Sequence, residues 1–169
     1  MKLIRTAKAN VSYTAIMSPE SIANGKVTPW SELVNNMNIP DGWKIHAHHL
    51  TMFMGDGNGK AKSILGNTVQ LQIVGIGKDE NVMALLVNTP VPTTNQKPHI
   101  TIATAPGIKP YQSNQLKTWN PLQEDSRIPK TIAGIIAEVD NQGNIINEEV
   151  EEEFGLEEPQ ELCNKDLPK

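Results

Sequence analysis

The chain has 169 residues, a length that favours one domain with a sizeable core. Hydrophobic residues make up 38% and charged residues 20%, which excludes a chain disordered throughout, and the net charge of −4 gives no sign of a large nucleic-acid-binding surface. The single cysteine, Cys163, excludes a disulfide or a cysteine-built metal cluster within one chain.

The N-terminal segment contains no apolar run of the kind that a signal peptide needs. No stretch approaches the roughly 20 consecutive apolar residues of a membrane span, so no membrane partner is expected. A single cysteine also fits a reducing compartment. These features predict a soluble cytoplasmic protein.

The first part of the chain predicts one strand and two helices. Residues 11–17, VSYTAIM, alternate as a strand does. Ser18 is a suitable N-cap with Pro19 in the first turn, and Gly25 would end this short helix. A second helix is expected from the Thr28 region to about residue 36. Its apolar side chains recur at helical spacing, at Trp30, Leu33, Val34 and Met37.

The middle of the chain predicts three strands. Residues 43–54 contain HAHHLTMFM and read as one strand in the interior of a sheet, followed by a flexible glycine-rich loop at 55–60. Residues 67–77 alternate apolar and polar side chains, as a strand with one buried face does. A turn at 78–81 then predicts a hairpin with a partner strand at 82–87.

A proline- and threonine-rich connection at 90–98 is too broken for regular structure. Residues 98–105, PHITIATA, predict a further strand that ends at Pro106-Gly107. Ser113 is a candidate N-cap for a helix running to about residue 119, and residues 121–129 predict a loop.

The last regular segment is a β-branched apolar run at 130–139, which predicts a strand followed by a turn at 141–144 and a short return. Beyond that point the sequence is acidic and loses periodicity. We therefore expect one domain over residues 1–147 and an acidic C-terminal tail over residues 148–169, with a short surface helix as the alternative for the tail.

The element order predicts an α+β fold, with a mostly antiparallel sheet and helices on its outer face. Two histidine–threonine strands, His49-Leu50-Thr51 and His99-Ile100-Thr101, recur 50 residues apart, and each is associated with a helical stretch. This recurrence favours a pseudo-duplicated, two-lobed arrangement around a central cleft.

The two His-x-Thr units carry the chemistry that the sequence suggests. Side chains two residues apart in a strand share a face, so each histidine lies beside its own threonine. If the strands are neighbours, His49, Thr51, His99 and Thr101 converge on one cleft. One neutral imidazole can take a proton from water and the other can donate one to a leaving oxygen, while the threonines bind anionic oxygens. This is phosphoryl chemistry that requires no metal or other cofactor.

Less specific alternatives exist for each residue. His49 and His99 could be hydrogen-bonded structural histidines, and the two threonines ordinary β-branched strand residues. Strict alternation puts His46 and His48 on the face opposite His49, which favours structural roles. His-x-His is also a metal-ligand spacing, but no carboxylate or cysteine stands close by in sequence to complete such a site.

The turn after the second unit is a candidate for contacts with substrate. Ser113 and Asn114 could simply cap a helix, but the same turn could close one side of the cleft, with Lys109 near phosphate and Tyr111 against a base. Three other aromatic residues are candidates for stacking on a base: Tyr13, Trp43 and Trp119. A core role is expected for the two tryptophans.

The run HITIATAPGIKPYQSN, residues 99–114, resembles the cyclic phosphodiesterase domain of fungal-type tRNA ligases, where a His-x-Thr strand is followed by a Lys-Pro-x-x-Ser-Asn turn. Two His-x-Thr strands are more broadly similar to the two-histidine phosphoesterase superfamily, which includes RNA ligase-like phosphodiesterases. The resemblance covers residues 11–139, although its specific positions are the two motifs and the turn.

The resemblance implies a metal-independent phosphodiesterase in which His49 and His99 are catalytic and Thr51 and Thr101 bind phosphate. The expected substrates are RNA 2′,3′-cyclic phosphate ends or small cyclic nucleotides, and the resemblance to the tRNA ligase domains implies a 2′-phosphate product. An alternative is hydrolysis of cyclic or 2′-5′-linked oligonucleotide second messengers, as in viral or phage immune evasion. A third is a non-catalytic module that binds nucleotide or RNA.

Overall fold

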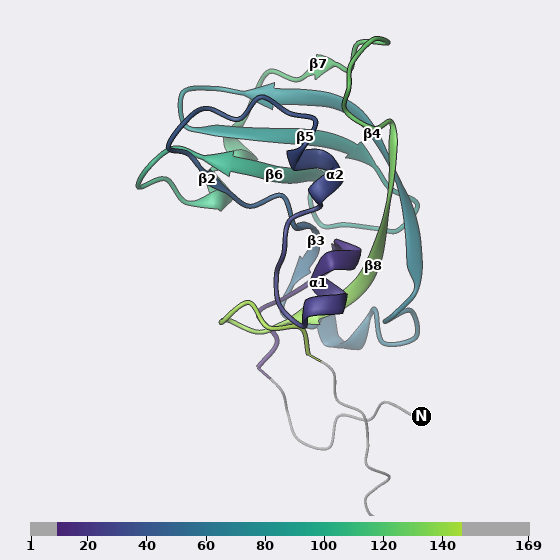
Figure 1. Cartoon of the computed structure of the whole chain (residues 1–169). Coiled ribbons are helices and arrows are strands. Elements are labelled where there is room, and N and C mark those ends of the chain that lie inside the picture. The colour runs from purple at the N-terminus through teal and green to yellow at the C-terminus, as the bar shows by residue number, and fades with distance from the viewer. Residues whose placement is uncertain (1–9, 147–169) are drawn as a thin grey trace, which may run out of the picture. The chain divides into compact units, whose positions relative to one another are not determined.

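Antiparallel strands make up most of the regular structure in the computed structural model, which describes residues 10–146 (Figure 1). Residues 11–145 form one unit, and the predicted tail at 148–169 lies outside the described residues. The strands are β1 (Tyr13–Met17), β2 (Lys44–Ile45), β3 (His49–Met54), β4 (Thr68–Lys78), β5 (Val82–Asn88), β6 (His99–Thr104), β7 (Asn120–Pro121) and β8 (Thr131–Val139). The helices are α1 (Pro19–Asn24), α2 (Ser31–Val34) and the 3-10 helices η1 (Gly57–Gly59) and η2 (Pro110–Gln115). The predicted α+β class with a mostly antiparallel sheet is confirmed.

The strand pairings close into a ring. Along the sheet the order is β6-β3-β1-β8-β4-β5, and β5 pairs in turn with β6. Short strands β2 and β7 add to β6 and β4. Every pairing in the described part of the chain is antiparallel. The division into two pseudo-duplicated lobes stays a prediction.

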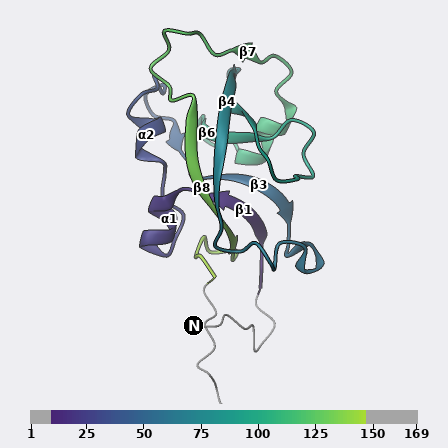
Figure 2. The ribbon, with the colours of Figure 1, turned by 90° about the vertical axis from the view of Figure 1, so that its right-hand side faces the viewer.

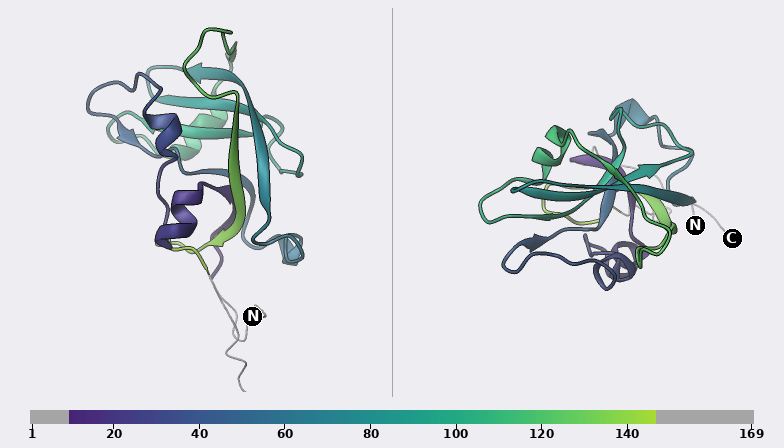
Figure 3. Two further views of the ribbon diagram at one scale, coloured as in Figure 1. Left: turned by 45° about the vertical axis from the view of Figure 1, so that its right-hand side comes forward. Right: turned by 90° about the horizontal axis from the view of Figure 1, so that it is seen from above.

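Strand β4 makes the corner of this ring. Its first half, Thr68–Gln72, pairs with β8, and its second half, Gln72–Lys78, pairs with β5. The register with β5 shifts between Ile73 and Gly75, and such a bulge bends a strand and increases its twist. Figure 3 shows β4 and β8 as two long, curved strands running side by side.

The core fills the inside of the ring. Alternate residues of the two His-x-Thr strands, Leu50 and Met52 on β3 and Ile100 and Ile102 on β6, are 0–2% exposed and belong to the main apolar cluster. Because alternate strand residues point to opposite faces, the histidines and threonines of both units lie on the outer face of the sheet. The buried residues of these two strands therefore alternate with half-buried histidines and threonines.

Helix α1 follows its predicted signals closely. The Ser18 hydroxyl accepts a hydrogen bond from the backbone N–H of Ser21, Pro19 occupies the first turn, and Gly25 closes the helix with φ of 74°. Helix α1 packs beside β8, and Figure 2 shows α1 and α2 on the same side of the sheet.

Helix α2 is shorter than predicted. It covers only Ser31–Val34, with Trp30 as N-cap and Asn35 as C-cap. Trp30 provides no side-chain hydrogen bond to the first turn. The predicted apolar stripe still packs on the core, with Trp30 and Leu33 buried. The Trp30 indole Nε1–H donates to the Ala133 carbonyl at 2.9 Å, which attaches this segment to β8.

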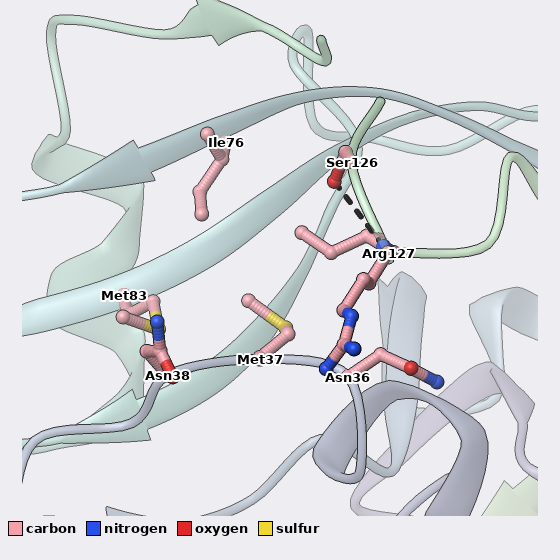
Figure 4. A pocket seen from close by; sticks show the side chains of 8 residues that line it. Asn36, Met37, Asn38, Ile76, Met83, Ser126 and Arg127 are labelled. Carbon is pink, nitrogen blue, oxygen red and sulfur yellow. Dashed lines mark hydrogen bonds between the residues drawn. The ribbon is translucent and has the colours of Figure 1, made fainter. Parts of the chain in front are cut away.

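A cavity of about 320 Å³ opens between the loop after α2, strands β4 and β5, and the segment that precedes β8 (Figure 4). It is lined by Asn36, Met37, Asn38, Ile76, Met83, Ser126, Arg127 and Ile128. None of these residues belongs to a His-x-Thr unit; the two units line a second pocket. No helix within residues 10–146 is long and apolar enough to cross a membrane.

Candidate active site

The two His-x-Thr strands meet at one residue pair. Leu50 on β3 pairs with Ile100 on β6, and no further pair is formed between these two strands in the described structure. Extending this antiparallel register by one residue in each direction sets His49 beside Thr101 and Thr51 beside His99. All four side chains of the two His-x-Thr units therefore lie around this single pair.

A pocket of about 200 Å³ lies at this place. Both members of each His-x-Thr unit line it: His49 with Thr51, and His99 with Thr101. Its remaining lining residues are Met54, Thr94, Asn95, Tyr111, Ser113 and Asn114. Both histidines are half-buried, so the pair is neither sealed from solvent nor divided between the two faces of the sheet.

His99 is held at both ring nitrogens. Its Nδ1–H donates to the Lys97 carbonyl at 2.8 Å, and its Nε2 lies 2.9 Å from the Ser113 hydroxyl. A carbonyl can only accept, so the first bond fixes the proton on Nδ1 of the neutral ring. The indole of Trp119 lies against the imidazole, with ring centroids 5.8 Å apart.

The Ser113 hydroxyl has three partners but a single proton. Besides His99 Nε2, it contacts the Thr101 hydroxyl at 2.7 Å and the Pro110 carbonyl at 2.9 Å. When that proton goes to Pro110, Nε2 of His99 must donate and the ring is an imidazolium. When it goes to Nε2, the ring is neutral. The network therefore accommodates both protonation states of His99.

The predicted helix at 113–119 is wrong. The 3-10 helix η2 begins at Pro110, with Lys109 as N-cap, and ends at Gln115, with Leu116 as C-cap. Ser113 is therefore an interior residue of η2, where it is buried and aimed at the histidine instead of capping a helix.

The surroundings of His49 are aromatic. Tyr13 on β1 stacks on one side of its ring with centroids 4.5 Å apart, and the His48 ring stacks at 4.8 Å. The Nδ1 atoms of His48 and His49 are 2.7 Å apart, a hydrogen-bond distance. His49 is thereby held in a fixed orientation beside the pocket.

Two predictions about this segment are wrong. Residues 43–54 form two strands, because the chain breaks at His46–His48, where Ala47 adopts a positive φ of 50°. Four residues lie between Ile45 and Leu50, whereas two lie between their partners Ala103 and Ile100 on β6, so the break holds two extra residues. This bulge interrupts the alternation, and His48 therefore packs against His49 instead of lying on the opposite face.

His46 has the structural surroundings that were expected. It is buried, and its Nε2 lies 2.9 Å from the hydroxyl of Thr104, which is also buried. Its ring meets the edge of His48 at 6.1 Å. Within residues 10–146, no group of three or more His, Cys, Asp or Glu side chains is placed to hold a metal ion.

The environment disfavours charge on all four histidines. Burial lowers the pKa of His48 to about 4, with help from the charges of His46 and Lys44. Burial first, and then His48, His46 and His99, lower the pKa of His49 well below its usual value. Burial also lowers the pKa of His99, although its bond to Lys97 acts in the opposite direction, and it lowers the pKa of His46.

These shifts predict that acid destabilises the fold. Below about pH 6.5 the histidines of the unfolded chain are protonated, whereas those of the folded chain stay neutral. The unfolded chain therefore binds more protons, and the free energy of unfolding decreases as the pH is lowered. Carboxylates change the free energy of unfolding mainly below about pH 4.5, so between about pH 4.5 and about pH 6.5 the change comes mainly from the histidines. We expect the urea midpoint to fall between about pH 7.5 and about pH 5, and to fall less in His48→Asn. Identical pH dependence in the two proteins would contradict the expectation.

The other predicted substrate contacts divide into two groups. Tyr111 and Ser113 line the pocket, and Tyr111 is 66% exposed at its rim. Tyr13 stands behind His49, and burial together with the charge of Asp140 raises the pKa of its phenol, which stays protonated. Lys109 is exposed at the start of η2 and does not line the pocket, so its contact with phosphate stays a prediction. Trp43 packs against the core, as expected.

Sequence reasoning missed the loop that completes the pocket. The backbone N–H of Thr94 donates to the Met52 carbonyl at 2.8 Å, and the Asn95 amide donates to Asn114 at 3.0 Å. This loop therefore bridges β3 and η2 across the rim. Only the adjacent Thr93, Thr94 and Asn95 hinted at this, since threonine and asparagine side chains can hydrogen-bond to the backbone of a loop.

A protein-family model described as the fungal tRNA ligase phosphodiesterase domain matches residues 30–145, which are 116 of the 169 residues. The match includes both His-x-Thr units and η2, so it contains every residue that lines the pocket. No curated protein and no solved structure matches the chain. The family suggests a phosphodiesterase with RNA or nucleotide substrates, in agreement with the resemblance seen in the motifs. The chain belongs to the family of fungal tRNA ligase phosphodiesterase domains.

Proposed function

We propose that this protein hydrolyses 2′,3′-cyclic phosphates, on RNA ends or on nucleotides, by acid–base catalysis with His49 and His99 and without a metal ion. The observation that carries the proposal is the shared pocket, in which two imidazoles and two threonine hydroxyls surround one space of about 200 Å³. This is the set of groups that an in-line displacement at a single phosphorus requires.

The reaction exchanges one P–O bond for another. One imidazole removes a proton from water as the water oxygen bonds to phosphorus. The bond from phosphorus to one ribose oxygen breaks, and the second imidazole donates a proton to that oxygen. The product is a phosphomonoester with an adjacent hydroxyl. Each proton transfer contributes about 10²–10⁴ in rate.

The two threonines stabilise the negative charge on the phosphate. Thr51 and Thr101 hydroxyls donate to the non-bridging oxygens, whose negative charge grows in the transition state. Thr101 shares its hydrogen bond with Ser113 in the free protein, so substrate binding exchanges one acceptor for another. Tyr111 at the rim offers a ring face on which a base can stack, for about 1–3 kcal/mol.

The direct test is a substrate panel in EDTA. We expect hydrolysis of nucleoside 2′,3′-cyclic monophosphates and of RNA oligonucleotides with a 2′,3′-cyclic end, with the same rate before and after chelation. Phosphorus NMR of the product identifies the 2′- or 3′-monoester, and the family resemblance favours the 2′-phosphate. Loss of activity in EDTA would overturn the metal-independent mechanism.

The same panel contains the competing substrates. Cyclic dinucleotides and 2′-5′-linked oligoadenylates test the second-messenger alternative, and preferential turnover of these would replace the proposed substrate. Tight binding of cyclic phosphates without turnover, unchanged in His49→Ala and His99→Ala, would instead support a non-catalytic binding module.

A further inference from the structure

The closest polar contact of His49 is to its own neighbour in the chain. The two Nδ1 atoms of His48 and His49 are 2.7 Å apart, and the rings stack with an interplanar angle of 19°. In His99, by comparison, the hydrogen-bond partner of Nδ1 is a backbone carbonyl, that of Lys97. A carbonyl can only accept a hydrogen bond, whereas an imidazole nitrogen can donate or accept, so the tautomers of the His48–His49 pair are linked.

Only one of the two facing nitrogens can carry a proton in this bond. With Nδ1 occupied, the nitrogen that His49 has left for a substrate is Nε2. Among the described residues, Trp119 Nε1 is the only buried side-chain polar atom without a hydrogen-bond partner. Nε2 of His49 is therefore not left buried and unsatisfied. If His49 holds its proton on Nδ1, its Nε2 carries a lone pair and can act as a base.

We infer that His48 is a positioning residue, which accepts the Nδ1–H of His49 and so keeps Nε2 of His49 free to remove a proton from water. The inference rests on the proposed function and makes His49 the general base and His99 the general acid. The arrangement suits the whole reaction. When Nε2 takes the proton, the resulting imidazolium still needs an acceptor at Nδ1, and His48 already provides one.

The backbone explains how His48 reaches this position. The two extra residues between β2 and β3, together with the positive φ of Ala47, turn His48 out of the strand alternation and over the His49 ring. A non-glycine residue with positive φ is uncommon and costs about 1–2 kcal/mol. Ala47 is fully buried, so the surrounding core holds it in this conformation.

Other titratable groups surround the His48–His49 pair. His46 and Lys44 approach His48 from the β2 side, Tyr13 stacks on His49 from β1, and His99 faces it from β6. Of these, only His48 makes a hydrogen bond to the His49 ring among the described residues. A change at His48 therefore alters both the tautomer and the pKa of His49, whereas a change at His46 alters neither tautomer.

The first experiment measures the tautomer without any substrate. Long-range ¹H–¹⁵N correlation spectra of the ¹⁵N-histidine-labelled full chain separate Nδ1–H from Nε2–H rings, and the chain has only four histidines, which single variants assign. We expect neutral His49 to be the Nδ1–H tautomer. An Nε2–H ring on His49 would overturn the inference. Because no turnover is needed, this result is independent of whether the proposed function is right.

The second experiment compares two replacements of His48. His48→Phe keeps an aromatic ring but removes the acceptor, whereas His48→Asn keeps an acceptor oxygen. We expect His48→Phe to lower kcat by about 10–100-fold with KM unchanged, as loss of an orienting partner does. In the same variant neutral His49 should lose its preference for the Nδ1–H tautomer, because the acceptor that fixed the tautomer is gone. His48→Asn should restore most of the lost kcat and the Nδ1–H tautomer.

His46→Asn is the matched control, since it removes a neighbouring imidazole that makes no bond to His49. It should keep the Nδ1–H tautomer of His49 and a kcat close to that of the wild type. The inference is overturned if His48→Phe has the wild-type kcat and tautomer, if it merely behaves like His46→Asn, or if His48→Asn is as impaired as His48→Phe. Absence of turnover in every protein, with His49 observed as the Nδ1–H tautomer, would count against the proposed function and leave the hydrogen bond standing.

Discussion

Replacing His99 with alanine is expected to lower kcat for hydrolysis of a nucleoside 2′,3′-cyclic monophosphate by about 10²–10⁴-fold, and His49→Ala by a similar factor. Each change removes one of the two proposed proton carriers, while Thr51 and Thr101, the proposed phosphate ligands, stay in the pocket. KM should therefore change far less than kcat. Initial rates in EDTA, followed by chromatography of the product, give both parameters.

The double variant makes the test sharper. The effects of substituting residues that act in one reaction step are strongly non-additive. The kcat of the double variant His49→Ala/His99→Ala should therefore be only slightly lower than that of the less active single variant. Gln70→Ala, an exposed change on β4 away from the pocket, is the control and should keep wild-type kcat. Wild-type turnover in either single histidine variant would contradict the proposed mechanism.

The largest expected effect on stability follows from Leu50→Ala, at about 2–5 kcal/mol in the free energy of unfolding. Leu50 is fully buried and is the one residue of β3 that pairs with β6, opposite the fully buried Ile100. It also pairs with Ile16 on β1. The truncation leaves a cavity inside the ring, which surrounding side chains fill only in part.

Urea unfolding at neutral pH, followed by tryptophan fluorescence, measures this loss. The matched control is Met54→Ala, a change of similar size in the same strand at a side chain that is 71% exposed, and it should stay within about 0.5 kcal/mol of wild type. A Leu50→Ala protein as stable as this control would show that the inner face of β3 is not the core.

The sequence predicted helices and strands well wherever a residue type has a strong preference for one backbone position. Ser18, Pro19 and Gly25 delimited α1 because cap, first-turn proline and positive-φ glycine each have a physical preference for those positions. Alternation in β4 and the 78–81 turn gave the hairpin. The shared face of each His-x-Thr unit followed from strand geometry alone.

What failed depended on the backbone elsewhere in the fold. Nothing in the sequence marks Ala47 for a positive φ, a conformation that usually favours glycine or asparagine, so the break between β2 and β3 was invisible. The face of His48 was wrong for that reason. Pro110, not Ser113, began the 3-10 helix, because a serine in a turn fits a cap and an interior site equally well. Ring closure through β5 and β6 is a long-range pairing that no local pattern reports.

The meeting of β3 and β6 at a single pair has a consequence for how such a protein changes over time. The spacing of the two imidazoles is set by main-chain pairing around Leu50 and Ile100, whereas the rim is contributed by a loop and by η2. Loops tolerate substitution and changes of length far better than paired strands do. Under the proposed function, divergence at Thr94, Asn95 and Tyr111 would therefore change which nucleotide is accepted while the spacing of the two imidazoles is kept.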